Sequence, residues 1–228
     1  MTNTTTRVIP RIISIEGPIG AGKSTILVEL ARFYEEKQRT DIVIMREPVE
    51  VWNSVCGEDG ESIIQKFYKN PGKYSFAFQT LICNTIVQEM ETIIANNPEC
   101  TTIICERSLC ASKYVFAKML YDDNLFEKAL YEIYSMAFKQ FAQGFVATKI
   151  VYLDCPPISC LARIERRGRT GEDRISIDYL IKCERYYINW MFSTKVPMLT
   201  IDVKKDIDIL SHIYKSYIVE IDDFIKLP

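Results

Sequence analysis

Residues 11–24 read RIISIEGPIGAGKS, an apolar strand candidate that runs directly into a glycine-rich turn opening a helix. The turn fits the pattern G-x-x-x-x-G-K-[ST] from Gly17 to Ser24. Glycines let backbone N–H groups curl around phosphate oxygens, and the following helix N-terminus adds a partial positive charge. Lys23 then reaches the β- and γ-phosphates, and the Ser24 hydroxyl is a ligand for Mg²⁺. The stretch predicts a P-loop, whose ATP-binding residues are Gly17, Pro18, Ile19, Gly20, Ala21, Gly22, Lys23, Ser24 and Thr25.

Short β-branched runs alternate with longer amphipathic segments along the rest of the chain. The strand candidates are residues 11–15, 41–45, 101–105, 148–153 and 197–201. The helix candidates are residues 24–37, 61–69, 74–96, 111–120, 125–143, 156–167, 176–193 and 206–226. This alternation predicts an α/β fold with a five-stranded parallel sheet, its strands buried on both faces by flanking helices. No repeat or Gly/Ser-rich linker divides the chain, so we expect one domain over residues 1–228.

Composition excludes several other classes. Lys and Arg total 28 and Asp and Glu 30 in 228 residues, so the formal net charge of −2 argues against a surface that coats nucleic acid. No apolar run of about 18 residues exists, and the N-terminus lacks a signal-peptide pattern, so we expect no membrane partner and a cytoplasmic location. Eight cysteines without a CxxC pair predict free thiols rather than a zinc site.

A P-loop identifies a nucleotide, not a reaction. The D-x-x-G and N-K-x-D patterns of GTPases are absent, and motor ATPases are far longer, which leaves a small kinase. The second strand candidate is followed by REPVEVW at residues 46–52. Ligands bind at the carboxyl ends of strands in open α/β sheets, so Glu47 should face the P-loop and accept the proton of an attacking hydroxyl. A surface glutamate before a proline turn is the alternative reading.

Two further charged segments follow the third and fourth strand candidates. Glu106-Arg107-Ser108 follows the third strand candidate. Glu106 is suited to bind Mg²⁺, and Arg107 is suited to bind a substrate oxygen or a phosphate. An ion pair that caps a helix is the alternative. Residues 163–174 are rich in arginine and carry two glycines, which predicts a lid that closes over ATP. Arg163 and Arg167 are i,i+4 neighbours, and an anion between them would relieve their repulsion. A solvated charged helix is the alternative here.

Five motifs in this order resemble the deoxynucleoside kinases: residues 13–24, the EPVExW segment at 47–52, Phe78-Gln79, Glu106-Arg107-Ser108 and the lid. The resemblance extends from about residue 11 to residue 225. It implies an ATP- and Mg²⁺-dependent enzyme of nucleotide salvage that phosphorylates the 5′-hydroxyl of a deoxynucleoside. It also implies a homodimer packed through helices.

The resemblance assigns roles to individual residues. Glu47 corresponds to the general base, Arg107 to the arginine on the 5′-oxygen, and Glu106, with Ser24, to the metal site. In catalysis Lys23, Arg167 and Arg169 would spread the charge of the transferred phosphoryl group. For ATP the resemblance adds two lid arginines and a loosely matched adenine loop, namely Arg163, Arg167 and Asp206. For the nucleoside it implies Glu47, Trp52, Tyr68, Phe78, Gln79, Ile82, Ile86, Arg107, Ser112, Phe116 and Glu172.

Base preference follows from one difference within this resemblance. Gln79 corresponds to the amide that bonds the base edge, and a carboxamide can match thymine or cytosine. Relatives that accept cytidine and purines hold an Arg–Asp pair where this chain has Ile86 and Ser112. Without that pair we predict a pyrimidine-preferring enzyme for thymidine and deoxycytidine. Gly171 is a further departure, because many relatives have a second acidic residue there.

Two other functions fit parts of the pattern. A nucleoside monophosphate kinase of the thymidylate kinase type shares the P-loop and the lid, but it needs extra basic residues for an acceptor phosphate. The neutral pocket implied by Tyr68, Gln79 and Phe116 speaks against it. A regulatory nucleotide-binding protein with an inactive site is the other alternative, and the intact Lys23 and Glu47 argue against it.

Overall fold

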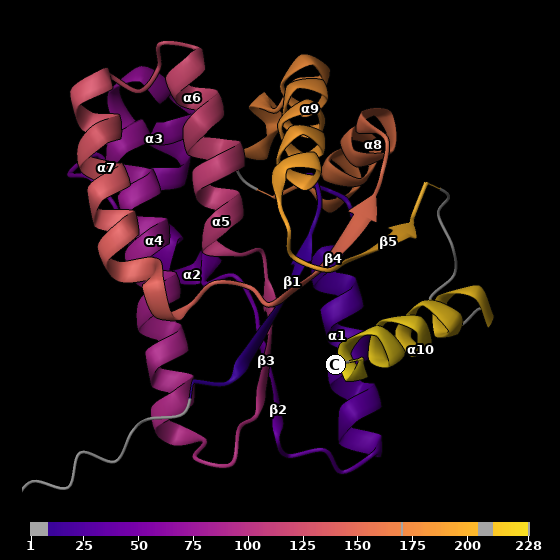
Figure 1. The fold of residues 1–228 in the computed structure, drawn as a ribbon. Coiled ribbons are helices and arrows are strands. Elements are labelled where there is room, and N and C mark those ends of the chain that lie inside the picture. The colour runs from indigo at the N-terminus through magenta and orange to yellow at the C-terminus, as the bar shows by residue number, and fades with distance from the viewer. Residues whose placement is uncertain (1–8, 170, 205–211, 228) are drawn as a thin grey trace, which may run out of the picture.

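The structure is a computed structural model, and it describes residues 9–169, 171–204 and 212–227. Five parallel strands form one sheet in the order β2-β3-β1-β4-β5 (Figure 1). The strands are β1 (Arg11–Glu16), β2 (Ile42–Met45), β3 (Thr102–Glu106), β4 (Lys149–Asp154) and β5 (Met198–Asp202). The predicted fold class and all five strand positions are confirmed.

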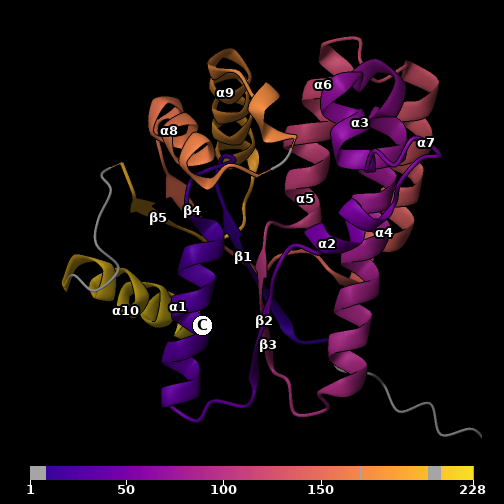
Figure 2. The same cartoon turned by 180° about the vertical axis from the view of Figure 1, so that it is seen from behind.

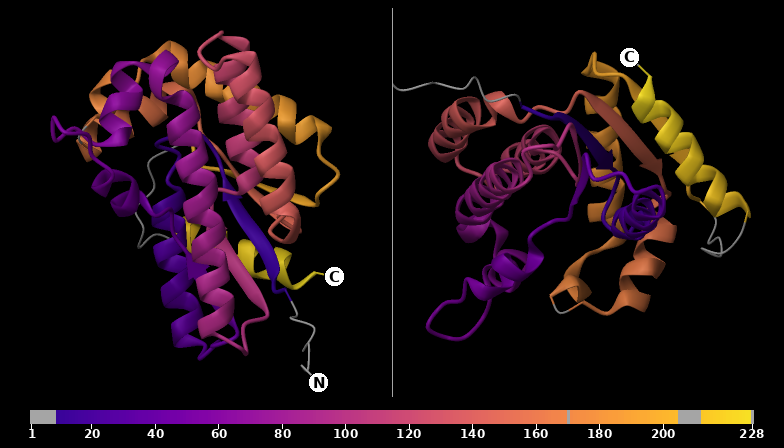
Figure 3. Two further views of the ribbon diagram at one scale, coloured as in Figure 1. Left: turned by 90° about the vertical axis from the view of Figure 1, so that its left-hand side faces the viewer. Right: turned by 90° about the horizontal axis from the view of Figure 1, so that it is seen from below.

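Helices cover both faces of this sheet. They are α1 (Lys23–Glu36), α2 (Val49–Ser54), α3 (Ile63–Lys69), α4 (Pro71–Asn96), α5 (Leu109–Ala111), α6 (Lys118–Asp122), α7 (Lys128–Phe141), α8 (Pro157–Arg167), α9 (Ile177–Ser193) and α10 (His212–Lys226). Seen from below, α4 and α7 lie on one side of the sheet and α1 and α10 on the other (Figure 3). Among the residues described, no helix is long and apolar enough to cross a membrane.

Side chains of the central strands alternate between two apolar layers. On β1, Ile12 packs into the layer that α4 and α7 share, while Ile13 and Ile15 pack with α1 and α10. Burial on both faces is therefore confirmed for β1, β3 and β4. It is wrong for β2, where only Met45 is buried, and for β5, where Met198 is 40% exposed. Each of these two strands has a neighbour on one side only, and no layer covers it fully.

Two helical segments differ from the prediction. Helix α2 was not expected, because six residues after Pro48 are too few to show a helical period. The helix expected at residues 111–120 contains a π-helical turn at Ser112–Ala117 between α5 and α6. Within the described residues, the helix expected at residues 206–226 is present as α10, and residues 205–211, which include Asp206, lie outside the described part of the chain.

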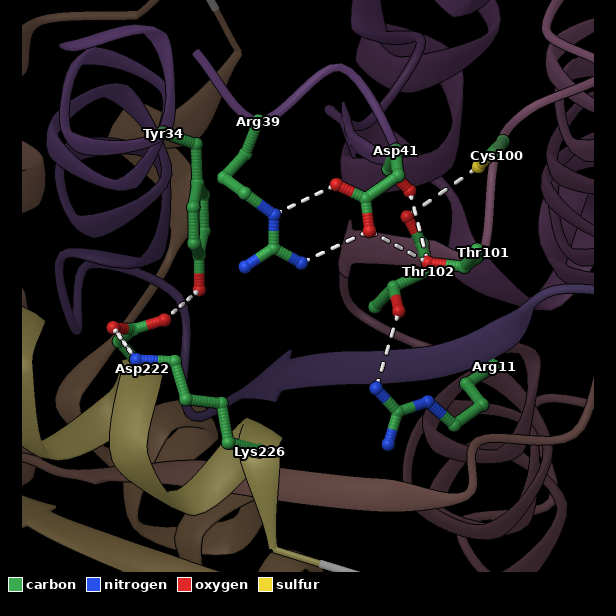
Figure 4. A network of polar contacts seen from close by, with 9 residues as sticks. All are labelled: Arg11, Tyr34, Arg39, Asp41, Cys100, Thr101, Thr102, Asp222 and Lys226. Atoms are coloured by element: carbon green, nitrogen blue, oxygen red, sulfur yellow. Dashed lines mark hydrogen bonds and ion pairs between the residues drawn. The ribbon is translucent and has the colours of Figure 1, made fainter. Parts of the chain in front are cut away.

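Polar contacts join α1 to α10, and stabilise the turn after α1, at the end of the sheet opposite the P-loop. The Tyr34 hydroxyl donates to Asp222 Oδ1 at 3.1 Å, and Lys226 Nζ lies 2.6 Å from Asp222 Oδ2 (Figure 4). Arg39 Nε donates to Asp41 Oδ1 at 2.7 Å in the turn that leads into β2. Figure 2 shows from behind how α1 runs beside α10. These contacts hold the helix whose other end carries the P-loop.

Candidate active site

The P-loop (residues 17–24) follows β1 and runs into α1, whose N-cap is Gly22. Gly17, Gly20 and Gly22 have φ values of +145°, +84° and +98°, a region that L-residues avoid. A Cβ atom at Gly20 would lie 2.5 Å from the carbonyl oxygen of Cys160 on α8, so the loop and the lid helix pack with no room for a side chain. The glycine spacing is thus needed for the turn and for its contact with the lid.

Lys23 carries a buried ammonium group at the start of α1. Its Nζ donates to the carbonyl oxygens of Gly17 at 3.0 Å and Pro18 at 2.9 Å. Burial and then the charge of Arg107 lower the pKa of Lys23 below its ordinary value. The ammonium therefore belongs to the loop itself, where an anionic phosphate would restore its preference for the charged form.

A cavity of about 1010 Å³ lies beside the P-loop and brings most of the predicted site residues together. From the P-loop and the strand ends they are Ile19, Gly20, Gly22, Lys23, Ser24, Thr25, Glu47, Glu106 and Arg107. From the helices and the lid they are Trp52, Tyr68, Phe78, Gln79, Ile82, Phe116, Arg163, Arg167, Arg169 and Glu172. The wall thus combines three strand ends with α2, α3, α4 and the lid.

Five predicted residues within the described ranges do not line this cavity. Three of them, Gly17, Pro18 and Ala21, belong to the P-loop. Ile86 and Ser112 are 1% exposed and lie behind the wall. Ile86 packs in the apolar layer of α4, and Ser112 is the first residue of the π-helical turn. Both were expected to line the cavity, and neither does.

Glu47 and Arg107 form an ion pair across the cavity. Arg107 Nη1 lies 3.2 Å from Glu47 Oε1, and both side chains are 12% exposed. Burial raises the pKa of Glu47, and the charge of Glu106 adds to the rise while Arg107 and Lys23 oppose it. A carboxylate with a raised pKa is a better proton acceptor near neutral pH. The pair can therefore hold a hydroxyl and take its proton.

Ser24 and Glu106 bring two oxygen ligands together. The Ser24 hydroxyl donates to Glu106 Oε1 at 2.6 Å, beside the P-loop. No group of three or more metal-binding side chains occurs in the described ranges. The two oxygens of Ser24 and Glu106 fit Mg²⁺, which is usually held by one or two protein oxygens together with phosphates and water. The donor set suits the metal of a phosphoryl transfer.

The apolar part of the cavity is built from aromatic rings. Trp52 lies edge-on to Phe78 with ring centroids 5.9 Å apart, and its Nε1 donates to Thr85 Oγ1 at 2.8 Å. The π-helical turn carries Phe116, whose ring centroid lies 4.4 Å from the guanidinium carbon of Arg107. Gln79 is 3% exposed, and its Oε1 has no hydrogen-bond partner among the described residues. An orphaned acceptor between rings indicates a planar ligand with a polar edge.

The lid arginines are paired differently from the prediction. Arg163 donates to the carbonyl oxygens of Val203 at 2.8 Å and Ala21 at 3.4 Å. Arg167 instead lies 2.5 Å from Glu172. The two guanidinium groups therefore have different partners, although both line the cavity, and an anion between them stays a prediction. Arg169 lies 3.6 Å from Glu172, so the acidic residue expected to bind the nucleoside instead pairs with two lid arginines.

Several lining residues were not anticipated from the sequence. They are Arg46, Pro48, Val49, Glu50, Val51, Asn53, Ile64, Phe67, Arg166 and Tyr179. Most belong to α2 and α3, and α2 left no periodic signal. Glu16, beneath the cavity, was missed as well, although a carboxyl group inside an apolar strand is an unusual pattern that points to it.

A P-loop on a five-stranded parallel sheet, with a carboxylate–arginine pair and an arginine lid, defines a P-loop phosphotransferase. The profile of the family described as "Deoxynucleoside kinase" matches residues 13–226, and the chain belongs to that family. The chain is 28% identical to the deoxycytidine kinase of Homo sapiens over 243 residues, covering 94% of this chain and 90% of that protein.

Two other relatives have similar coverage. A probable deoxycytidine kinase of fowlpox virus is 31% identical over 223 residues, covering 94% of this chain and 88% of the relative. The mitochondrial deoxyguanosine kinase of Xenopus laevis is 26% identical, covering 86% of this chain and 82% of the relative. The predicted family and the enzyme class, a kinase that uses a nucleotide phosphate donor, are therefore confirmed.

Proposed function

We propose that this kinase transfers the γ-phosphoryl group of ATP to the 5′-hydroxyl of a deoxynucleoside, with thymidine and deoxycytidine preferred. The observation that carries the proposal is the Glu47–Arg107 pair, 3.2 Å apart between the P-loop and the aromatic wall. An acceptor hydroxyl lying between these two groups would meet a proton acceptor and a hydrogen-bond donor at once. One kinase domain, with residues 163–174 as its lid, is part of the proposal.

In this mechanism the chain acts mainly by positioning and electrostatics. Arg107 donates to the 5′-oxygen while Glu47 accepts its proton, which turns the hydroxyl into a nucleophile. Lys23, Arg167 and Arg169 stabilise the negative charge that develops on the transferred group. Ser24 and Glu106 would hold Mg²⁺, which when bound neutralises phosphate charge.

The nucleoside would occupy the apolar part of the cavity. Phe116 provides a ring for stacking, and Gln79 presents its amide to the base edge. Trp52 and Phe78 close the wall, and Ile82 adds an apolar surface that suits a thymine methyl group. Tyr68 lines the same cavity, and burial raises its pKa, so it remains a neutral hydroxyl for a sugar contact.

The base preference depends on what the wall lacks. Ile86 and Ser112, at the positions of the Arg–Asp pair in purine-accepting relatives, are buried and uncharged. A substrate that loses a hydrogen-bond partner in the site can lose several powers of ten in kcat/KM, whereas an apolar misfit lowers kcat/KM far less. Steady-state kcat/KM values for the four deoxynucleosides test this, with a purine ranking first as the contrary outcome.

A second candidate is a nucleoside monophosphate kinase. Arg46 and Arg166 line the cavity in addition to the predicted arginines, and they are the kind of extra basic residue that an acceptor phosphate needs. Release of ADP with thymidine, compared with release with thymidine monophosphate, separates the two candidates. A higher kcat/KM for the monophosphate would replace the first proposal by the second.

A homodimer and a cytoplasmic location complete the proposal. Helix α7 exposes apolar side chains, with Ile133 52%, Met136 72% and Phe141 51% exposed, as a helix-packed dimer requires. All eight cysteines are free thiols, as is usual in a reducing compartment. Light scattering of the purified chain tests the dimer.

A further inference from the structure

Glu16 ends β1 as a carboxyl group in an otherwise apolar strand, and the mechanism above gives it no part. It is 0% exposed. Its Oε1 accepts a hydrogen bond from the backbone N–H of Ser108 at 2.8 Å, and its Oε2 accepts one from the Tyr187 hydroxyl at 3.4 Å. Burying a carboxyl group is costly, and an apolar residue of similar size would fill the same space. The hydrogen bonds therefore indicate a task other than packing.

The first hydrogen bond fixes a strained turn. Arg107, the residue before Ser108, has φ +62°, a left-handed conformation that costs a non-glycine residue about 1–2 kcal/mol. Two neighbours on β1 hold this turn: the Arg107 N–H donates to the Ile15 carbonyl oxygen at 3.0 Å, and the Ser108 N–H donates to Glu16. The turn leaves the strand direction and places the Arg107 guanidinium beside Glu47, 3.2 Å away.

The second hydrogen bond comes from Tyr187, whose ring packs against Phe116, the ring beside the Arg107 guanidinium. Tyr187 is 0% exposed, and its ring lies edge-on to Phe116 at 6.1 Å and 85°. The other partner of Phe116 is the Arg107 guanidinium, 4.4 Å from the ring centroid. One carboxyl group thus holds the backbone of Arg107 and, through Tyr187, the ring under its guanidinium.

We propose that Glu16 is a positioning residue that aims Arg107 at the acceptor oxygen and keeps Phe116 beneath it. The proposal rests on the proposed function, in which Arg107 binds that oxygen. It concerns hydrogen-bond geometry rather than charge. A displacement of about 1 Å at a reacting group costs about 10²-fold in rate, so turnover should depend on where the oxygens of residue 16 lie.

Two substitutions separate geometry from charge. Glu16→Gln keeps Oε1 for the Ser108 N–H, and its amide N–H can donate to the Tyr187 oxygen, so kcat should stay within about tenfold of wild type, the worth of one hydrogen bond. Glu16→Asp keeps the charge but withdraws it by about 1.5 Å, one carbon–carbon bond, so kcat should fall about 10²-fold. The Kd for ATP should stay unchanged in both variants. An aspartate variant as active as the glutamine variant, or more active, would overturn the proposal.

A double-mutant cycle tests whether Glu16 acts through Arg107. In an Arg107→Ala background, Glu16→Asp should lower kcat no further, because neighbours that act as a unit are not additive. Additive losses overturn the inference. If Arg107→Ala alone kept wild-type turnover, the proposed function would fall and this inference with it. If only Arg107→Ala impaired turnover, the inference alone would fall.

Asp222 offers a matched control, because it is another buried carboxylate that accepts from a tyrosine, Tyr34, far from the cavity. Asp222→Asn should lower thermal stability and leave kcat unchanged, which separates general destabilisation from misplacement. Should Glu16→Asp not fold, Tyr187→Phe tests the same geometry, since it removes only the hydroxyl that Glu16 accepts from. We expect about a tenfold loss of kcat with the ATP Kd unchanged. Wild-type kcat in this variant would overturn the proposal.

Discussion

Replacement of Glu47 by Gln removes a proton acceptor while keeping its shape. The side chain is 12% exposed and lies 3.2 Å from Arg107, so the amide fits the same space. Loss of a general base lowers kcat by about 10²- to 10⁴-fold. The change also removes an attraction to Arg107 of about 5 kcal/mol at this separation for an effective dielectric constant of about 20, before the cost of burial is subtracted. A looser Arg107 would raise the nucleoside KM, whereas the missing base lowers kcat.

Single-turnover measurements with saturating ATP isolate the chemical step. We expect Glu47→Gln to lower the rate at least about 10²-fold and to retain ATP binding, because the P-loop is intact. Glu50→Gln is the matched control, since Glu50 is a carboxylate on the same cavity wall that is exposed to solvent. It should keep near wild-type rates. A near wild-type single-turnover rate for Glu47→Gln would refute the assignment of the general base.

The pH profile gives a second test of the same group. Burial raises the pKa of Glu47 above its ordinary value of 4.5. A base acts only when deprotonated, so kcat/KM should fall as the pH drops through this raised pKa, above the pH expected for an exposed glutamate. The variant should lose this acid limb. An acid limb that persists in Glu47→Gln would belong to another group.

Further predictions follow from the lid, the P-loop and the C-terminal helix. Arg167→Ala and Arg169→Ala should lower kcat more than they raise the nucleoside KM, because the charge that they meet grows in the transition state; a rise in KM alone would make them sugar or base contacts. Gly20→Ala adds a Cβ 2.5 Å from the Cys160 carbonyl at φ +84°, so calorimetry should show at least about tenfold weaker ATP binding, and unchanged affinity would contradict the packing argument. Burial opposes ionisation of Asp222, but its bonds to Lys226 and Tyr34 outweigh burial and lower its pKa. Its carboxylate therefore stabilises the fold above the unfolded-state pKa, and that stability is lost as the pH falls through the lower folded-state pKa. Asp222→Asn should cost about 1–3 kcal/mol at neutral pH and less in acid, measured by urea unfolding, and an equal loss at both pH values would contradict the sign.

The strand ends explain why much of the site was predictable. Parallel strands bring their carboxyl ends to one edge of a sheet, so charged residues that follow buried strands meet there whatever the details of the loops. Glu47 follows β2, and Glu106 and Arg107 end β3, and all three line the cavity with the P-loop of β1. The apolar pattern sufficed to place these residues because it fixes the strands.

The helical wall and the lid depend on contacts that no local pattern contains. Ile86 lies seven residues after Gln79 on α4, yet Gln79 lines the cavity and Ile86 packs in the core. A π-helical turn sets the direction of Phe116, and its cause lies in the packing around it. Arg167 pairs with Glu172 across a glycine-containing turn. Spacing along the chain could suggest that these residues belong to the site, but not which side chains they contact.

The charges around Glu47 bear on which acceptor the cavity takes. A phosphate on the acceptor would bring about two negative charges toward Glu47, whose pKa is raised first by burial and further by the charge of Glu106. A neutral hydroxyl meets no such repulsion and gains a hydrogen bond from Arg107, which the ring of Phe116 holds from behind. Arg46 and Glu50, both exposed at the cavity wall, carry opposite charges and offer a phosphate little net attraction. The electrostatics at the centre of the cavity therefore favour a nucleoside over its monophosphate, even though arginines outnumber carboxylates on the wall as a whole.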